Sequence, residues 1–256
     1  MAENRRRFLS RAGAGAAAVL LSGCTSLSQR KWVTDLLSDV EILTRHAQRL
    51  FAGSQTLAPE FSKKDIAPVF RANGTLDPAT PDYNAHAANG FRDWRIEVGG
   101  LVERPLSLSV AELRGFPSRT QITRHDCVEG WSCIGEWTGM PLRLVLAAAK
   151  VKPDARYVVF HCADNMAVAG DTPQFYYESL DLLEATHPQT LLAYELNGQA
   201  LPIEHGAPVR LRAERQLGYK MAKYVRRIEL VEGFAHINGG RGGYWEDQGY
   251  NWYAGI

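Results

Sequence analysis

Short strand-like and helix-like segments follow one another from Trp94 to the C-terminus without regular alternation. Apolar runs bounded by turn residues predict strands over 94–102, 155–163, 191–202, 207–213 and 223–233, with Asn197-Gly198 as the turn of a hairpin. Capping residues and three-and-four spacing predict short helices over 109–115, 138–150 and 176–186. Because a parallel sheet needs strands and helices in regular alternation, this order predicts an α+β fold with mixed sheets and short helices.

The segment before Trp94 divides into two parts. Residues 31–51 carry apolar side chains three and four positions apart, including Trp32, Leu36, Val40 and Leu43, which predicts a helix. Residues 52–92 are rich in Gly, Pro, Asn, Asp and Ala, which predicts irregular structure. Because long irregular stretches in a folded domain tend to be functional or disordered, "FRANGT" at 70–75 is of interest.

The first 24 residues have the pattern of an export signal. Arg5, Arg6 and Arg7 precede a short apolar run that is too short to span a bilayer, and small residues precede Cys24. The paired arginines resemble a twin-arginine signal, and "LSGC" resembles the lipobox of a lipoprotein. The alternative is an ordinary basic N-terminus with a chance cysteine. The pattern predicts a periplasmic protein that is lipid-anchored at Cys24, and since this route exports folded proteins, it favours a cofactor enzyme.

These features predict three parts of the chain: a twin-arginine lipoprotein signal over 1–24, an N-terminal helix and linker over 25–69, and the main domain over 70–256. The formal net charge is +1 and basic residues form no run beyond the signal. A chain with this charge pattern lacks the basic surface that nucleic-acid binding requires, so we expect no nucleic-acid partner.

The stretch "RHDCVEGWSCIGEWTGMPL" at 124–142 places Cys127 among acidic and aromatic side chains. Cys127 and Cys133 are close enough in sequence to form a disulfide in an oxidising compartment, which would fit a non-catalytic, disulfide-stabilised lipoprotein. His125 lies two residues before Cys127, which on an extended segment allows a thiolate–imidazole nucleophile. The third alternative is a metal ligand, since a thiolate is a soft donor.

The ordered motifs of the chain resemble the sulfite oxidase-like molybdopterin enzymes. "CVEGW" at 127–131 followed by "WTGMPL" at 137–142 is similar to their molybdenum-binding segment, and most similar to the branch of periplasmic methionine-sulfoxide reductase catalytic subunits. The resemblance continues through "YVVFHCAD", "LLAYELNGQALPIEHGAPVRL" and "GYKMAKYVRRIEL" to the tail "GGYWEDQGYNW". It implies a sulfite oxidase-type fold and an oxidoreductase that carries out two-electron oxygen-atom transfer.

The resemblance also implies a set of site residues. Cys127 would be the only protein ligand of molybdenum, with Glu129 as a candidate for proton delivery and Trp131 beside the reaction centre. The residues implied to line the molybdopterin and its phosphate are Asn73, Cys162, His205, Arg210, Tyr219, Lys220 and Lys223. An arginine suits an anionic oxygen because its guanidinium donates two parallel hydrogen bonds.

Departures from the family pattern bear on the substrate. Sulfite oxidases need arginines to hold the sulfite anion, but Ala72 and Trp131 occupy two of the expected positions. Trp131, Trp137 and Tyr219 are expected to form an apolar mouth that favours a neutral sulfoxide. His205, in contrast, looks more like sulfite oxidase, so a sulfite oxidase-type dehydrogenase remains the alternative. By resemblance, electrons would come from a haem protein, either a membrane cytochrome b or a cytochrome c.

Overall fold

The computed structural model describes residues 30, 40, 43–49, 53, 56–167 and 171–256. The chain divides into two compact units, Met1–Phe51 and Ala52–Ile256, which are considered separately. In the first unit residues 43–49 are helical, which confirms that part of the helix predicted over 31–51. The predicted signal over 1–24 lies outside the described residues. Within the part of the chain that is described, no helix has the length and apolar character needed to cross a membrane.

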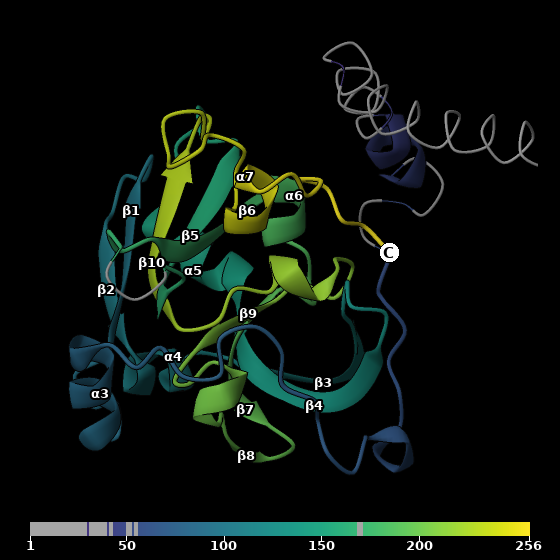
Figure 1. Cartoon of the computed structure of the whole chain (residues 1–256), viewed down its shortest axis with the longest axis vertical. Coiled ribbons are helices and arrows are strands. Elements are labelled where there is room, and N and C mark those ends of the chain that lie inside the picture. The colour runs from purple at the N-terminus through teal and green to yellow at the C-terminus, as the bar shows by residue number, and fades with distance from the viewer. Residues whose placement is uncertain (1–29, 31–39, 41–42, 50–52, 54–55, 168–170) are drawn as a thin grey trace, which may run out of the picture. The chain divides into compact units, whose positions relative to one another are not determined.

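The first sheet of the second unit has five strands in the order β2-β1-β10-β5-β6 (Figure 1). Strand β1 runs parallel to β10, and the other neighbouring pairs are antiparallel. The strands are β1 (Arg95–Gly100), β2 (Leu106–Ser109), β5 (Tyr157–Asn165), β6 (Phe175–Asp181) and β10 (Val225–Val231). Strands far apart in the sequence are therefore neighbours, and the sheet is mixed as expected.

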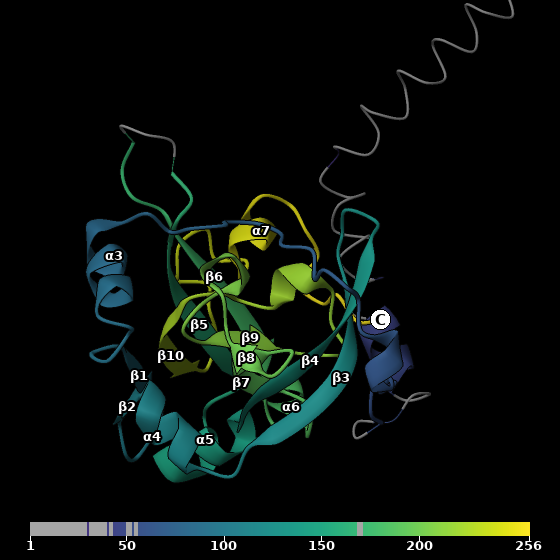
Figure 2. The same cartoon turned by 90° about the horizontal axis from the view of Figure 1, so that it is seen from below.

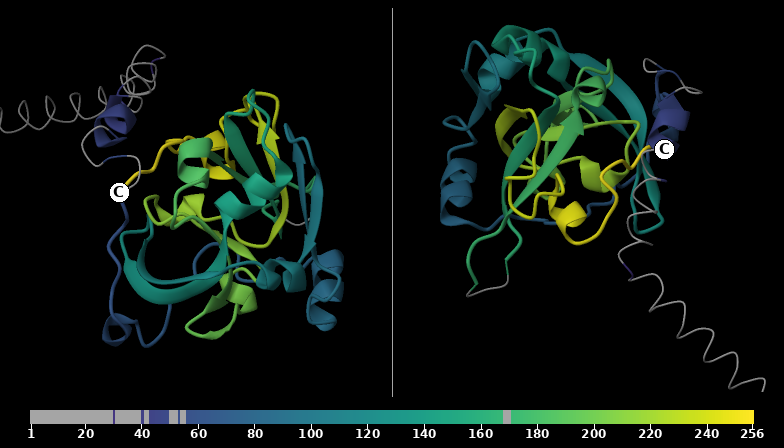
Figure 3. Two further views of the ribbon diagram at one scale, coloured as in Figure 1. Left: turned by 180° about the vertical axis from the view of Figure 1, so that it is seen from behind. Right: turned by 90° about the horizontal axis from the view of Figure 1, so that it is seen from above.

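The second sheet has the order β3-β4-β7-β8, and β9 pairs with β7. Its strands are β3 (Arg119–Asp126), β4 (Ser132–Pro141), β7 (Leu191–Leu196), β8 (Gln199–Ala200) and β9 (Arg210–Arg212). Strands β3 and β4 form a long, strongly curved hairpin (Figure 2), which is also visible from behind and from above in Figure 3. Residues 56–69 run alongside this hairpin. The backbone N–H of Phe61 donates to the carbonyl of Ile122, and that of Ala67 donates to the carbonyl of Ile134.

The helices are short. They are η1 (Lys63–Asp65), α3 (Pro81–Ala88), α4 (Val110–Gly115), α5 (Leu142–Ala149), α6 (Leu182–Ala185), η2 (Ile203–His205), η3 (Gly218–Lys220) and α7 (Tyr244–Asp247). Helix α4 begins at Ser109, whose hydroxyl accepts from the backbone of Glu112 while the Glu112 carboxylate accepts from the backbone of Ser109. This reciprocal cap confirms the predicted start of that helix.

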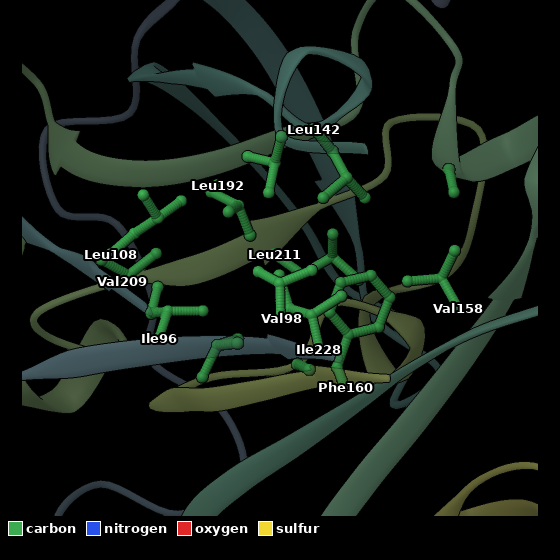
Figure 4. Packing of buried hydrophobic residues seen from close by; sticks show 14 of the residues in the cluster. Ile96, Val98, Leu108, Leu142, Val158, Phe160, Leu192, Val209, Leu211 and Ile228 are labelled. Atoms are coloured by element: carbon green, nitrogen blue, oxygen red, sulfur yellow. The ribbon is translucent and has the colours of Figure 1, made fainter. Parts of the chain in front are cut away.

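One apolar core joins the two sheets. Val98, Phe160 and Ile228 from the first sheet belong to the same buried cluster as Leu192 and Leu211 from the second (Figure 4). Each of these side chains is fully or almost fully buried. Since burying one such side chain stabilises the fold by about 1.5–3 kcal/mol, this shared core holds the sheets in a fixed relation.

The structure corrects two helix predictions and adds helices that were not predicted, among them α3 and α7. Residues 138–141 belong to β4, and the helix predicted over 138–150 begins only at Leu142, because the preceding residues pair with β3 and β7. The helix predicted over 176–186 is strand β6 up to Asp181, which then caps α6. Helix α3 was not predicted, although Thr80 and Pro81 are favourable residues for a helix start. The remaining pattern confirms the α+β prediction.

Candidate functional site

A cavity opens where strands of both sheets, the segment from Asn73 to Thr75 and the C-terminal residues meet. Its polar lining includes Asn73, Cys127, Glu129, Asp164, Arg210 and Lys223, and its apolar lining includes Met166, Tyr176, Tyr219, Met221, Trp245 and Tyr250. These residues come from β5, β6, β9, η3, α7 and the connecting loops. The cavity thus combines a thiol and two cations with an apolar wall.

Cys127 lies at the start of the tight turn between β3 and β4. Its backbone N–H donates to Trp131 over 2.9 Å, and its carbonyl accepts from the N–H of Gly130 over 3.0 Å. Gly130 has a φ of 86°, a left-handed conformation that glycine adopts without strain. The turn therefore holds Cys127 in the wall of the cavity.

The Cys127 thiol is buried and free, and so is that of Cys133, so the two form no disulfide. Burial raises the pKa of the Cys127 thiol; a backbone N–H from Glu129 lowers it, as do the Arg71 charge and a hydrogen bond with the Asn73 side chain. Cys133 instead lies in the apolar cluster around Phe70 and Trp137. The structure therefore leaves the Cys127 thiol available as a ligand, and it does not contain the disulfide between Cys127 and Cys133 that the alternative hypothesis requires.

Arg210 and Lys223 bring two cations to the cavity wall. The Arg210 guanidinium donates to the carbonyls of His205 (3.0 Å) and Met221 (3.2 Å). Among the described residues Arg210 Nε has no hydrogen-bond partner. Burial and the neighbouring Arg212 lower the pKa of Arg210 to about 9. Arg210 therefore has a buried donor left over on the side chain that also lines the cavity.

Lys223 has the same kind of environment. Its ammonium donates to the carbonyls of Asn73 (2.8 Å), Glu204 (2.9 Å) and Thr75. In the described part of the chain no carboxylate forms an ion pair with Lys223 or Arg210. Burial and the Arg210 charge lower the pKa of Lys223 to about 7. Two buried cations with only neutral acceptors form an electrostatic site for an anion.

Lys220 lies in a different environment from that expected. Its side chain is almost fully buried and does not line the cavity; its ammonium is paired with Glu178 and, at 2.6 Å, with Glu246. Although burial acts against the charged form, these carboxylates raise the pKa of Lys220 above its ordinary value. The structure therefore provides no free charge at Lys220 for a cofactor phosphate.

His205 and Cys162 are near the cavity but do not line it. His205 ends η2 with its ring against Phe70, and burial together with the Arg210 and Lys223 charges lowers its pKa to about 4. Cys162 is buried in the main apolar core, where desolvation raises its thiol pKa. Their predicted roles as cofactor contacts stay predictions.

Trp131 reaches the cavity indirectly. Its indole N–H donates to the Glu129 carboxylate over 2.8 Å, and Glu129 lines the cavity. The guanidinium carbon of Arg71 lies 4.8 Å from the centre of the Trp131 ring, a cation–π arrangement. Arg71 is therefore an arginine beside Ala72 and Trp131, the two positions where the sequence lacks the arginines expected of a sulfite oxidase.

The apolar wall differs from the predicted one. Tyr219 lines the cavity as expected, whereas Trp137 is fully buried in the core and Trp131 is not part of the lining. Trp245 and Tyr250 complete the wall instead, with stacked rings whose centres are 5.3 Å apart. Both residues belong to the aromatic tail "GGYWEDQGYNW", which forms part of the resemblance. The spacing of residues in this tail does not indicate that it folds back to the cavity.

Backbone at η3 reaches the same region through a glycine. A Cβ at Gly218 would lie 2.4 Å from Nε2 of His125, so only glycine fits beside this buried histidine. His125 Nδ1 is bonded to Arg212 over 3.0 Å, and burial lowers the His125 pKa well below its ordinary value. His125 is therefore a neutral, positioned ring and not a base paired with Cys127.

The residues present fit a molybdopterin cofactor in two respects. The cofactor's phosphate needs an anion site, which the unpartnered donor of Arg210 and the ammonium charge of Lys223, paired with no carboxylate in the described part of the chain, provide. Molybdenum needs a soft donor, and the Cys127 thiol is free and lines the same cavity.

Comparison with known proteins supports this fit. Residues 83–235 match the model of the oxidoreductase molybdopterin-binding domain. A protein of Azospira oryzae, provisionally named protein-methionine-sulfoxide reductase subunit YedZ1, is 35% identical over 98% of this chain and 87% of its own length. The protein-methionine-sulfoxide reductase catalytic subunits MsrP of Gluconobacter oxydans and Xanthomonas axonopodis are 36% and 42% identical over 62% and 54% of this chain.

The matched region spans about half the length of these two MsrP proteins, 52% and 45%. Among solved structures, the sulfane dehydrogenase SoxCD of Paracoccus pantotrophus is 27% identical, with a TM-score of 0.48 over 55% of this chain and 39% of that one. Since the domain model covers more than half of the 256 residues and the Azospira relative covers nearly all of them, the chain belongs to the molybdopterin-binding oxidoreductase family.

Proposed function

We propose that the chain is a molybdenum-dependent oxidoreductase that reduces sulfoxides, with Cys127 as the protein ligand of the metal. The observation that carries this proposal is the cavity itself, where a free buried thiol shares one wall with the cations of Arg210 and Lys223. The names of the similar MsrP proteins support the same reaction class.

In this proposal Arg210 and Lys223 bind the phosphate of molybdopterin. A buried guanidinium with an unused N–H gains a charge-assisted hydrogen bond to a phosphate oxygen, which is stronger than a bond to a carbonyl. The Asn73 side chain, which also lines the cavity and lowers the pKa of the Cys127 thiol, would keep the sulfur oriented. Tyr219 contributes to the wall beside the cofactor.

The bound cofactor supplies two-electron oxygen-atom transfer chemistry. The protein's own residues position the reactants and exclude water. Met166, Tyr176, Trp245 and Tyr250 present an apolar wall that suits the two carbon substituents of a sulfoxide. Glu129, held by the Trp131 indole N–H, lies at the exposed side of the cavity and orients the turn that carries Cys127.

A substrate comparison tests the reaction. Protein purified after growth with molybdate is assayed for reduction of dimethyl sulfoxide and of free and peptide-bound methionine sulfoxide, with reduced methyl viologen as donor. Oxidation of sulfite is assayed with ferricyanide as acceptor. We expect sulfoxide reduction to be the faster reaction; a sulfite oxidation rate well above it would overturn the proposal.

One observation favours the alternative, a sulfite oxidase-type dehydrogenase. Arg71 places a cation over Trp131, near a position where sulfite oxidases need an arginine. If Arg71 binds the substrate, Arg71→Ala lowers sulfite oxidation strongly and leaves reduction of a neutral sulfoxide little changed. Equal effects on both substrates would show that Arg71 acts only through Trp131.

We also propose the setting in which the enzyme works. The sequence supports twin-arginine export, lipidation of Cys24 and a haem-containing electron donor, either a membrane cytochrome b or a cytochrome c. Replacing Arg5 and Arg6 with Lys is expected to retain the protein in the cytoplasm, and Cys24→Ala is expected to release a soluble form or to leave an unprocessed precursor. Normal periplasmic delivery of the first variant, or unchanged attachment of the second, would contradict these assignments.

A further inference from the structure

A second carboxylate lines the cavity, and nothing in the proposed cofactor binding uses it. Asp164 lies near the end of β5, and its side chain is only 3% exposed. Its atom Oδ1 makes no hydrogen bond among the described residues, although the residue is part of the cavity lining. A buried carboxyl with an unpartnered oxygen needs a specific reason, because an unsatisfied polar atom destabilises the fold by about 1–3 kcal/mol.

Sulfoxide reduction requires a source of protons at the site where oxygen leaves. The sulfur–oxygen bond breaks, the sulfoxide gains two electrons, and the oxygen departs with two protons as water. The haem donor, or reduced viologen in an assay, supplies the electrons one at a time. The ionisable side chains that line the cavity, together with solvent, are the sources from which these protons can come.

Resting on the function proposed above, we propose that Asp164 is the proton-exchanging group of this cavity and the general acid that delivers one of these protons. The second proton comes from solvent, which also reprotonates Asp164 between turnovers. Asp164 replaces Glu129 in the role expected from the sequence, since Glu129 is exposed and its carboxylate is held by the Trp131 N–H.

The surroundings of Asp164 suit a group that exchanges a proton near neutral pH. Burial raises the pKa of Asp164 to about 6, while its own backbone N–H, the Thr75 hydroxyl and the Lys223 charge act in the opposite direction. The ionisable side chains coupled to it from the neighbouring elements are Tyr83, Cys162, Tyr176, Lys223 and Tyr224. Of these only Lys223 can be a cation, so burial is opposed mainly by the two hydrogen bonds and to a smaller extent by one ammonium.

The test compares Asp164→Asn with the wild type and with Asp154→Asn, which removes an exposed carboxylate far from the cavity lining in the same type of change. The wild-type kcat for dimethyl sulfoxide is expected to fall as the pH rises through about 6, since the acid must be protonated. Asp164→Asn is expected to lower kcat about 100-fold, the usual contribution of a general acid, and to remove this fall. Asp164→Glu is expected to restore part of the rate.

Two readouts do not depend on turnover. Difference infrared spectra of the wild type and of Asp154→Asn are expected to show a buried carboxylic acid that titrates near pH 6 and is missing from Asp164→Asn. Molybdenum and pterin contents of Asp164→Asn are expected to equal those of the wild type.

The proposal is overturned if Asp164→Asn keeps the wild-type rate and pH profile, if it loses its cofactor, or if the wild-type spectrum shows no titrating acid. Should the wild type reduce no sulfoxide at all, the proposed function fails. The infrared titration then decides separately whether Asp164 exchanges protons in this cavity.

Discussion

Lys220 and Lys223 are three residues apart, both are buried, and they have opposite electrostatic surroundings. Lys220 is neutralised by Glu178 and Glu246, which raise its pKa, whereas Lys223 has only carbonyl acceptors and its pKa is lowered to about 7. The first lysine therefore completes a closed ion-pair cluster. The second lies beside Arg210 and forms no ion pair among the described residues, although the Asp164 and Glu204 carboxylates act on its charge from a distance. This difference distinguishes a structural cation from one that can bind an anion.

The sequence predicts the same role for both lysines, but the fold gives them different partners. Both lie in "GYKMAKY" and both were expected to contact the cofactor. The strand β6 and helix α7 that carry the two partners of Lys220 come from elsewhere in the chain. Lys223 instead lies next to the backbone of 73–75 and of η2.

Loss of the thiol is expected to have the largest effect on activity. Cys127→Ser keeps the turn between β3 and β4, but a hydroxyl is a harder and weaker donor to molybdenum than a thiolate. Turnover is expected to fall to background while the pterin is retained through Arg210 and Lys223. Activity assays and pterin content check this; a variant with half the wild-type rate would show that Cys127 is not the ligand.

Removal of the charge at Lys220 is expected to have the largest effect on stability. Lys220→Met leaves Glu178 and Glu246 buried without a cation, which destabilises a protein by about 3–5 kcal/mol. Lys223→Met, in contrast, removes a buried charge that forms no ion pair and donates only to carbonyls, so the cofactor-free protein is expected to lose less stability than Lys220→Met does. Urea unfolding of both variants measures the difference, and equal destabilisation would contradict it.

The cofactor-free protein is expected to become more stable as the pH rises above 7. The folded Lys223 loses its proton near pH 7 and the unfolded lysine near 10.5, so between these values the unfolded chain binds more protons and stability rises with pH. A shift of this size corresponds to at most about 5 kcal/mol. Urea unfolding between pH 6.5 and 9.5 is expected to show the rise in the wild type and a weaker one in Lys223→Met; the same slope in both would contradict it.

Cys133→Ala is expected to have the smallest effect. Cys133 packs with Phe70 and Trp137 away from the cavity lining, and its thiol donates a weak hydrogen bond to the Val69 carbonyl at 3.6 Å. Loss of one small buried side chain lowers the unfolding free energy by about 1 kcal/mol. Sulfoxide reduction and metal content are expected to stay at wild-type values, and a loss of metal would indicate that both cysteines serve the site.

The sequence predicted best what depends on local pattern. The strand β1, the cap of α4 and the hairpin of β7 and β8 follow from alternation, a capping box and an Asn-Gly turn. It failed where pairing between distant strands decides, since 138–141 and 176–181 were predicted as parts of helices but are bonded into sheets. Long-range pairing overrides the local preference of a segment.

The same distinction applies to the site. Cys127, Asn73, Arg210 and Lys223 were identified by resemblance and lie together on the cavity wall. Asp164, Trp245 and Tyr250 were not identified, because burial and the folding back of the tail create their roles. No pattern in "CADNM" or "YWEDQGY" distinguishes these residues from ordinary core or surface positions.

The most direct test of the account is the cofactor content of Lys223→Met and Arg210→Met compared with that of Lys220→Met, measured per folded protein after growth with molybdate. Molybdenum is measured by mass spectrometry and released pterin by fluorescence. A lost charge-assisted bond weakens binding by about 1.5–3 kcal/mol, or roughly 10- to 150-fold, so the first two variants are expected to be largely cofactor-free and Lys220→Met to remain loaded. A loaded Lys223→Met or Arg210→Met beside an empty Lys220→Met would contradict the assignment of the anion site.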